Sequence, residues 1–269
     1  MRRLSILVSL TVTALAVVAC ASSPTGRGQM IFKSDEALAR EFDRVWVEYK
    51  AAHSLSTDRA TIDYVHCVAT AVVDALPDEY RDQDWQMAIF DDDEVQAFAG
   101  PGGKIGVHTG LLKAAHNQDQ LAAVIGHEIG HVTSRHQNED ISRAAMSGVG
   151  IQVAAVLLGG GHSGATYTAY EALQAGAVLG VNLPFSRAQE TEADVVGIEY
   201  MARAGFDPRE TVPLWQNMQK EAGEKAPPEF LSTHPSSDTR IESLISEWAE
   251  VLPIYNEAKA NGRNPNCSM

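Results

Sequence analysis

Positive charge is scarce in this chain. Among its 269 residues, 21 Lys and Arg stand against 35 Asp and Glu, a formal net charge of −14. Such a surface repels phosphate, so we expect no nucleic-acid partner and no electrostatic adhesion to anionic lipid. Internal repeats and linker-like stretches are also missing after residue 30, which predicts one domain with one sizeable core over residues 31–269.

The motifs of several enzyme classes are absent as well. Neither Cys67 nor Ser134 has the Cys/His or G-x-S-x-G surroundings of a catalytic nucleophile. The glycines at 100–106 fit neither a G-x-G-x-x-G nor a Walker pattern, and Lys104 is not followed by Ser or Thr, which excludes a nucleotide loop. The acidic run 91–94 lacks the alternating acids and the glycine of an EF-hand, which favours a solvated turn over a calcium site.

The N-terminus carries an apolar run over residues 4–19, preceded by two arginines. The Val-Val-Ala-Cys that ends at Cys20 fits a bacterial lipoprotein signal, in which this cysteine is lipidated and becomes the first mature residue. The alternative is a transmembrane anchor, but the run is short for one and holds several Ser, Thr and Ala. We expect a signal peptide at 1–19 and a flexible tether at 20–30, where Ser, Pro and Gly gather.

That signal also indicates a compartment. By resemblance to bacterial lipoprotein sorting, Ala21 and Ser22 favour an outer-membrane lipid anchor on the periplasmic face. In an oxidising periplasm the remaining cysteines, Cys67 and Cys267, are candidates for a disulfide. A buried Cys67 thiol and a disordered C-terminal tail remain alternatives.

The most informative segment is His127-Glu128-Ile129-Gly130-His131. On a helix, two histidines four apart present their nitrogens on one face, where they can bind zinc, and Glu128 can take a proton from a zinc-bound water. Asn117 is a capping residue, and apolar residues recur at helical spacing between 121 and 132, so the motif lies in a helix with a buried face. Two helix histidines that merely pack or face water are the alternative.

A catalytic zinc needs a third protein ligand. Glu190 and Asp194 are four residues apart, so on one helix the first can bind zinc while the second accepts a hydrogen bond from a zinc-bound histidine. Glu192 lies on the far side of that helix, which predicts a solvated acid.

These residues resemble the HtpX and CAAX prenyl endopeptidase family of zinc metallopeptidases. The family pattern is H-E-x-x-H followed by S-R-x-x-E-x-x-A-D, and it fits Ser186, Arg187, Glu190, Ala193 and Asp194. The resemblance implies that Glu190 is the third ligand of one Zn²⁺ per chain and that Arg187 and Asp194 support the site. It also implies an α+β fold, a mostly helical gluzincin-type domain with a small β-sheet at its cleft.

Two further segments extend the resemblance. Residues 95–112 resemble N-A-F-x-x-P-G-G-x-I-x-V-x-x-G-L-L, with Gln96 in place of Asn; the Pro-Gly-Gly predicts a turn between two short strands, one of which could bind an extended polypeptide through main-chain hydrogen bonds. Residues 231–241 resemble the T-H-P segment with its R-I. His234 could stabilise the oxyanion or occupy the fourth zinc position, and Arg240 could steady the segment or pair with an acid.

We therefore expect a zinc metalloendopeptidase in which Glu128 is the general base and His234 can stabilise the developing negative charge. The resemblance implies misfolded or stalled envelope proteins as substrates and transient envelope partners. Two alternatives stay open: an assembly factor for outer-membrane proteins with a mostly idle peptidase site, and a zinc amidase or other hydrolase of a non-protein bond.

The remaining expectations concern secondary structure and two histidines. We expect helices over 35–52 and 58–76, and strands over 85–90, 95–98 and 104–108, with helices in most of the remainder. Small and apolar residues at 144–183 predict buried helices joined by a loop, or a mobile flap over the cleft. His162 in that loop is not expected to be a ligand, and His136 is expected to face solvent.

Overall fold

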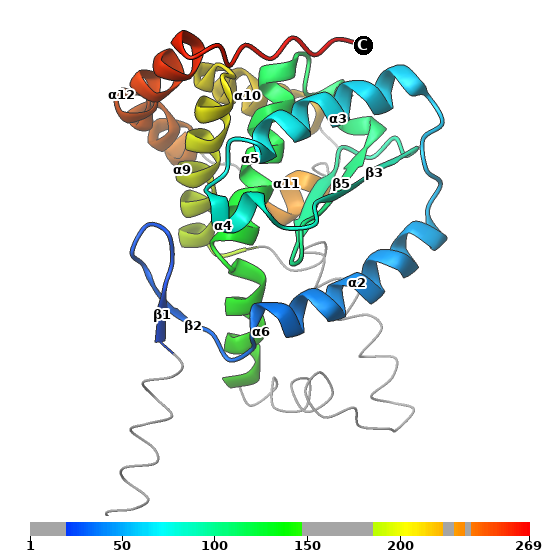
Figure 1. The fold of residues 1–269 in the computed structure, drawn as a ribbon, viewed down its shortest axis with the longest axis vertical. Helices are drawn as coiled ribbons and strands as arrows, with labels where there is room; N and C mark the ends of the chain where they lie inside the picture. Colours follow the sequence, from blue (N-terminus) through cyan, green and yellow to red (C-terminus); the bar gives the residue numbers. More distant parts are fainter. Residues whose placement is uncertain (1–19, 147–184, 223–228, 235–237) are drawn as a thin grey trace, which may run out of the picture.

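The computed structural model describes residues 20–146, 185–222, 229–234 and 238–269. Figure 1 shows helices packed around a small sheet, with the N-terminal hairpin β1–β2 beside α6 at one end of the domain. This arrangement agrees with the α+β class expected from the sequence. The segment 1–19, expected to be a signal peptide, and most of the 144–183 region, including His162, lie outside the described residues.

The elements follow one another along the chain as β1 (Cys20–Ser22), β2 (Gly28–Met30), α2 (Asp35–Ala52), α3 (Arg59–Val73), α4 (Asp78–Arg81), β3 (Gln86–Phe90), β4 (Ala97–Gly100), β5 (Lys104–His108), the 3₁₀ helix η1 (Thr109–Lys113), α5 (Gln118–Thr133), α6 (His136–Met146), α9 (Arg187–Ala204), the 3₁₀ helix η2 (Pro208–Glu210), α10 (Thr211–Ala222), α11 (Glu229–Thr233) and α12 (Asp238–Ala260). Among the described residues, no helix is both long and apolar enough to span a bilayer.

The first two long helices show how local signals set the boundaries. α2 spans the predicted range and begins where the Ser34 side chain accepts a hydrogen bond from the Ala37 N–H. α3 ends at Val73, three residues before the predicted end at 76. The chain forms turns there, in which the Leu76 N–H donates to the Val73 carbonyl, and the residue after Leu76 is Pro77. A residue before proline disfavours the helical conformation, so the helix ends early.

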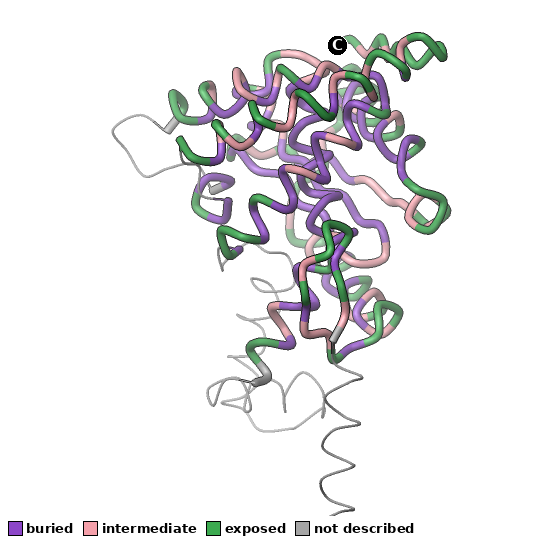
Figure 2. The backbone as a smooth tube through the Cα atoms, turned by 90° about the vertical axis from the view of Figure 1, so that its left-hand side faces the viewer, coloured by how far each residue is buried: buried purple, intermediate pink, exposed green. Residues whose placement is uncertain are grey.

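The three-stranded sheet has the order β3-β5-β4, with β5 parallel to β3 and antiparallel to β4. The turn between β4 and β5 needs Gly102 and Gly103, whose φ angles are +78° and +76°. Trp46 of α2 packs on one face of the sheet, with ring centroids 6.2 Å from Phe90 and 6.0 Å from Phe98. The other face joins the main core with α3 and α5. Figure 2 shows that buried residues gather in the interior of the domain and exposed ones at its periphery.

Helices α5 and α9 form the centre of this core and touch through their backbones. A Cβ atom added at Gly197 of α9 would lie 2.7 Å from the backbone nitrogen of His127 on α5, and one added at Gly130 would lie 2.8 Å from the carbonyl oxygen of Ala193. Glycine at these positions therefore allows the two helices, and the side chains they carry, to approach closely.

The segment predicted to be a flexible tether forms instead the hairpin β1–β2, in which Ala21 pairs with Gln29. The prediction of a tether at 20–30 is wrong because two residues of the hairpin have partners in the domain. Arg27 binds carboxylates, and the Gln29 side-chain amide donates to the Ser134 carbonyl at 2.6 Å. Polar composition alone did not show these partners.

A disulfide joins Cys67 of α3 to Cys267, with a Cα–Cα distance of 5.8 Å. It fixes the C-terminal tail to the helical core, and the Cys267 N–H donates to the Gln118 side chain at 2.8 Å.

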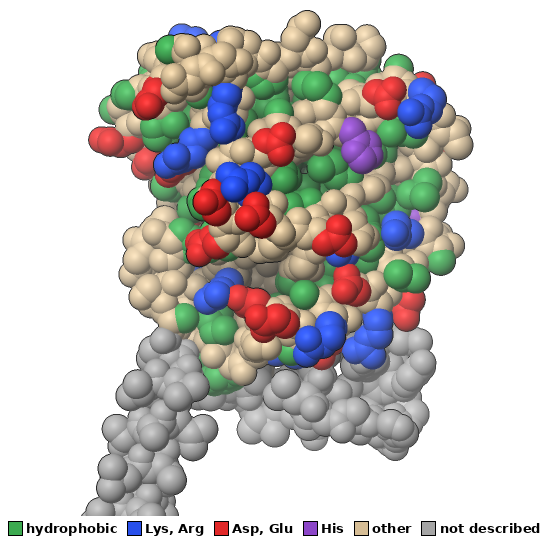
Figure 3. Space-filling model, viewed as in Figure 1, with side chains coloured by type: hydrophobic (Ala, Val, Ile, Leu, Met, Phe, Trp, Pro, Cys, Tyr) green, Lys and Arg blue, Asp and Glu red, His purple; other side chains and the backbone are tan. Residues whose placement is uncertain are grey.

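On the face that Figure 3 shows, the described Asp and Glu side chains lie scattered among Lys and Arg, so that this face presents no continuous basic surface.

Candidate metal centre

Four side chains from three parts of the chain converge in the core. α5 supplies His127 and His131, α9 supplies Glu190, and His234 follows α11. The Nε2 atom of His127 lies 3.0 Å from Nε2 of His131 and 3.2 Å from Nδ1 of His234. Oε1 of Glu190 lies 3.0 Å from Nδ1 of His234 and 3.5 Å from Nε2 of His131. All four side chains are buried and could together hold a metal ion.

The local sequence explains why these donors meet. Asn117 caps α5 through the Gln120 N–H, and the four-residue spacing places both histidines on one face of that helix. Ser186 and Gln189 form a capping box at the start of α9, which fixes Glu190 in the first turn.

The donor set suits a cation. Nδ1 of His127 lies 3.0 Å from Oδ1 of Asp194, so this edge of the ring faces a carboxylate, while Nε2 faces the other donors. Burial lowers the pKa of His127, but hydrogen bonds with Asp194 and Glu190 outweigh it and raise the pKa to about 9. The two carboxylates thus stabilise positive charge at this point, and a bound cation would take the place of the proton on Nε2.

Glu128 lies beside the donor group and is not part of it. Its Oε1 is buried without a hydrogen-bond donor among the described residues, and it lies 3.4 Å from Nε2 of His234. Burial raises the pKa of the Glu128 carboxyl above its ordinary value. An acid with a raised pKa beside a candidate metal position is suited to proton transfer.

His234 occupies a corner of the donor group. Its ring stacks on Phe230, with centroids 4.7 Å apart, and its Nδ1 faces Glu190 and His127. Of the two roles left open by the sequence, this orientation matches that of a fourth ligand. To act on an oxyanion, the ring would have to leave this corner.

Asp194 and Arg240 lie behind His127. Oδ2 of Asp194 accepts a hydrogen bond from Nε of Arg240 at 2.7 Å, and the Arg240 NH1 group lies 2.7 Å from Oε2 of Glu190. The guanidinium also lies over the ring of Trp215, 4.3 Å from its centroid. Arg240 thus pairs with two acids of the site, and the His127 ring is held by a buried carboxylate–guanidinium pair.

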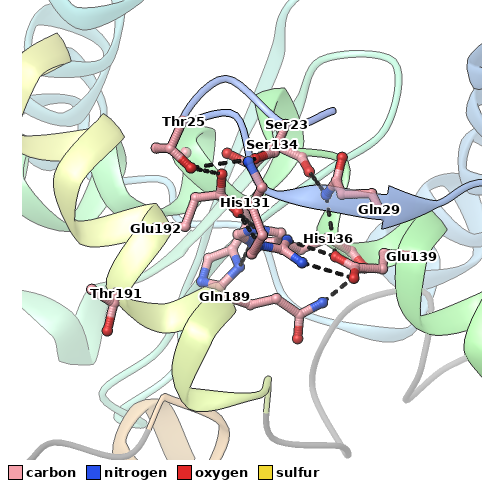
Figure 4. A network of polar contacts seen from close by, with 12 residues as sticks. Ser23, Thr25, Gln29, His131, Ser134, His136, Glu139, Gln189, Thr191 and Glu192 are labelled. Carbon is pink, nitrogen blue, oxygen red and sulfur yellow. Dashed lines mark hydrogen bonds and ion pairs between the residues drawn. The ribbon is translucent and has the colours of Figure 1, made fainter. Parts of the chain in front are cut away.

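A second group of polar side chains lies behind His131, and the sequence did not predict it (Figure 4). Nδ1 of His136 lies 2.8 Å from Nδ1 of His131, and Nε2 of His136 lies 3.1 Å from Oε2 of Glu192. Both predictions for these residues are wrong: His136 and Glu192 are buried, not solvated. The helical conformation is interrupted between α5 and α6 at Arg135, whose φ is 56°. This change of direction turns His136 back toward His131.

Arg187 differs from expectation. The Arg187 side chain is exposed at the start of α9, and no hydrogen bond or ion pair joins it to a described residue, so it does not support the donor group. Strand β4 is at the edge of the sheet, and two of its outward backbone groups bond to glutamine side chains. The Ala99 carbonyl accepts from Gln137 at 3.0 Å, and the Ala97 N–H donates to Gln96 at 3.1 Å.

Comparison with known proteins matches residues 59–248 to peptidase family M48. The chain is similar to the mitochondrial metalloendopeptidase OMA1 of Schizosaccharomyces pombe, 38% identical over 179 residues, which cover 65% of this chain and 50% of the relative. It is also similar to the beta-barrel assembly-enhancing protease of Escherichia coli, 35% identical over 171 residues, which cover 62% of this chain and 35% of that protein. The chain thus spans half or less of the length of these relatives. Because the family match covers well over half of the sequence and includes all four donors, the chain belongs to peptidase family M48.

Proposed function

We propose that this protein is a zinc-dependent metalloendopeptidase, and the observation that carries the proposal is the shape of the donor group. Zinc–nitrogen distances of about 2.0–2.1 Å place the ligand atoms of a tetrahedral site about 3.3–3.4 Å apart. The five measured distances among His127, His131, Glu190 and His234 are 3.0 to 3.6 Å. Nitrogen and carboxylate donors at this spacing suit zinc better than a cation that prefers six or more oxygens.

When bound, zinc supplies a Lewis acid that polarises the scissile carbonyl and acidifies a water molecule. Glu128 takes the proton from the attacking water and delivers it to the leaving amine. This role suits its raised pKa and an Oε1 atom that accepts no hydrogen bond from the described part of the chain. The pair formed by Asp194 and Arg240 holds the ring of His127 in one orientation.

The substrate we propose is an extended polypeptide that binds beside β4. The outward N–H and carbonyl groups of this strand would pair with the substrate backbone. In the structure, the side-chain amides of Gln96 and Gln137 occupy part of this edge, so they would have to move when a substrate binds.

The setting we propose is the periplasmic face of the outer membrane, with Cys20 as the lipidated residue and misfolded or stalled envelope proteins as substrates. The lipoprotein-type sequence around Cys20 supports the setting. Similarity to a protein named as a beta-barrel assembly-enhancing protease supports the substrate class. Partners would then be transient envelope proteins.

One observation favours a second function, an assembly factor with a mostly idle peptidase site. His234 fills the corner of the donor group that a catalytic zinc site leaves for water and substrate. With His234 in this position, the protein would bind clients more often than it cleaves them.

Zinc content and casein cleavage test these functions. We expect about one zinc per chain in the full-length protein, its loss in Glu190→Ala, and cleavage that Glu128→Gln abolishes without releasing zinc. A wild-type protein that binds no zinc, or cleavage that survives in Glu128→Gln, would contradict the proposal. His234→Ala separates the two functions: faster cleavage identifies His234 as a cap, whereas slower cleavage identifies it as an oxyanion group.

A further inference from the structure

We propose that Arg27 of the N-terminal hairpin is a positioning residue for the metal centre, and that it acts on His131 through Glu192 and His136. The inference rests on the proposed role of His131 as a zinc ligand. It goes beyond that role by including a segment near the N-terminus, outside the part of the chain that matches the peptidase family.

The contacts form a continuous path from the hairpin to the ligand, and Figure 4 shows three residues of this path, Glu192, His136 and His131. Nε of Arg27 donates to Oε2 of Glu192 at 2.8 Å, and the same oxygen lies 3.1 Å from Nε2 of His136. On the other side of the His136 ring, Nδ1 lies 2.8 Å from Nδ1 of His131. Every heavy-atom distance on the path is within hydrogen-bonding range, and His131, His136 and Glu192 are buried.

Zinc binding allows one arrangement of hydrogens along this path. If Nε2 of His131 binds zinc, its Nδ1 carries the hydrogen and donates to Nδ1 of His136. The His136 hydrogen is then on Nε2 and is donated to Glu192, which also accepts from Arg27. Each donor meets an acceptor, so the position of the Glu192 carboxylate determines how the ring of His131 is oriented.

Arg27 compensates two buried carboxylates at once. Its NH1 and NH2 groups donate to Glu139 at 2.8 and 2.7 Å, while Nε donates to Glu192. The side chains of Glu139 and Glu192 are only 1% and 3% exposed, whereas that of Arg27 is 23% exposed. Two carboxylates so buried need a charged donor, and a guanidinium can bind both because its donors form a rigid fork.

The other ligand histidine of α5 is held by a similar path of a carboxylate and an arginine. His127 is held by Asp194, and Asp194 by Arg240 of α12. His131 is held by His136 and Glu192, and Glu192 by Arg27 of the hairpin. Both carboxylates come from α9, and both paths end on an arginine. Guanidinium groups from near the two ends of the chain therefore orient the two histidines of the zinc-binding helix.

Zinc affinity and the spectrum of the cobalt(II)-substituted protein test this inference, both measured on the full-length chain. We expect Arg27→Ala and Glu192→Gln each to weaken zinc binding about 10- to 100-fold in competition with a chelator, the range typical of residues that orient metal ligands. Arg27→Lys, which keeps the charge and loses the fork, should lose less. At saturating cobalt, the visible absorption bands should shift in Arg27→Ala, because these bands report ligand geometry.

Arg203→Ala is the matched control. It removes an arginine that pairs with Glu199 on the exposed side of α9, outside the path, and should change neither readout. If the hairpin only stabilised the fold, Arg27→Ala would lower the unfolding temperature while zinc affinity and the cobalt bands stayed as in wild type, and the inference would be overturned. A wild-type protein that binds no zinc would instead refute the proposed function.

Discussion

Replacing Gly197 by alanine tests whether the α5–α9 contact sets the geometry of the metal centre. The added Cβ would lie 2.7 Å from the backbone nitrogen of His127 and 2.8 Å from the carbonyl carbon of Gly126. These are backbone atoms of a buried helix, so no side chain can rotate away to make room. α9 must move relative to α5.

The size of that movement follows from the contact distance. Ordinary contacts of a Cβ begin at 3.4 Å, so the helices must separate by about 0.6–0.7 Å. Metal–ligand distances tolerate about 0.2 Å. Because α5 carries two donors and α9 carries Glu190, this separation lengthens the distances between their donor atoms by more than metal–ligand distances tolerate. Overpacking of this kind costs about 1–3 kcal/mol of the free energy of unfolding, and misplacement near 1 Å costs about 100-fold in catalytic rate.

The assay compares Gly197→Ala with wild type in zinc affinity, kcat/KM for a peptide substrate and thermal unfolding. Gly28→Ala is the control, because a Cβ at that glycine meets nothing within 4 Å. We expect a large loss of zinc affinity and of kcat/KM in Gly197→Ala, a modest loss of stability, and no change in the control. Wild-type zinc affinity in a folded Gly197→Ala protein would refute the reasoning, since the helices would then not set the donor spacing.

Three other predictions concern stability. Paired replacement of Cys67 and Cys267 by serine should lower the free energy of unfolding by about 2–5 kcal/mol, measured in urea, because the bond closes a loop with a sequence separation of 200. Burial raises the pKa of Asp140 from 3.8 to about 6, so the folded state holds more protons than the unfolded state between these values and stability falls as pH rises through them. Asp140→Asn, which can still accept from Gln189, should be more stable than wild type at pH 7 by about 2–3 kcal/mol, and the difference should vanish near pH 4 in urea titrations. Chelation should lower the unfolding temperature of wild type and leave that of Glu190→Ala unchanged, as measured by calorimetry.

The sequence predicted the parts of the fold whose signals are local. Caps at Ser34 and Asn117 set helix starts, and the glycines at 102 and 103 set the turn between two strands. The spacing within α5 placed His127 and His131 on one face for the same reason, since four residues make about one turn. These signals extend over a few residues, so they need no knowledge of the rest of the chain.

The network behind His131 was not predicted, because helical spacing alone assigned one buried face to α9 and placed Glu192 in solvent. Glu192 does lie on the far side of α9 from Glu190, as predicted. That side is also buried, however, because the hairpin and α6 pack against it and Arg27 reaches Glu192 across 165 residues of sequence. Spacing tells which residues share a face, but only the packing of distant segments tells whether a face meets water.

The order of the segment 20–30, predicted as a flexible tether, also depends on contacts with distant parts of the chain. A polar segment stays disordered when it has no apolar surface to bury and no buried charge to compensate. The hairpin buries little apolar surface, but Arg27 and Gln29 donate to the buried Glu139, and Arg27 also donates to the buried Glu192. A buried carboxylate without a donor costs more free energy than ordering a few residues. The acids at 139 and 192 therefore explain why this polar segment is ordered, and Glu192 also contacts His136, which lies behind His131.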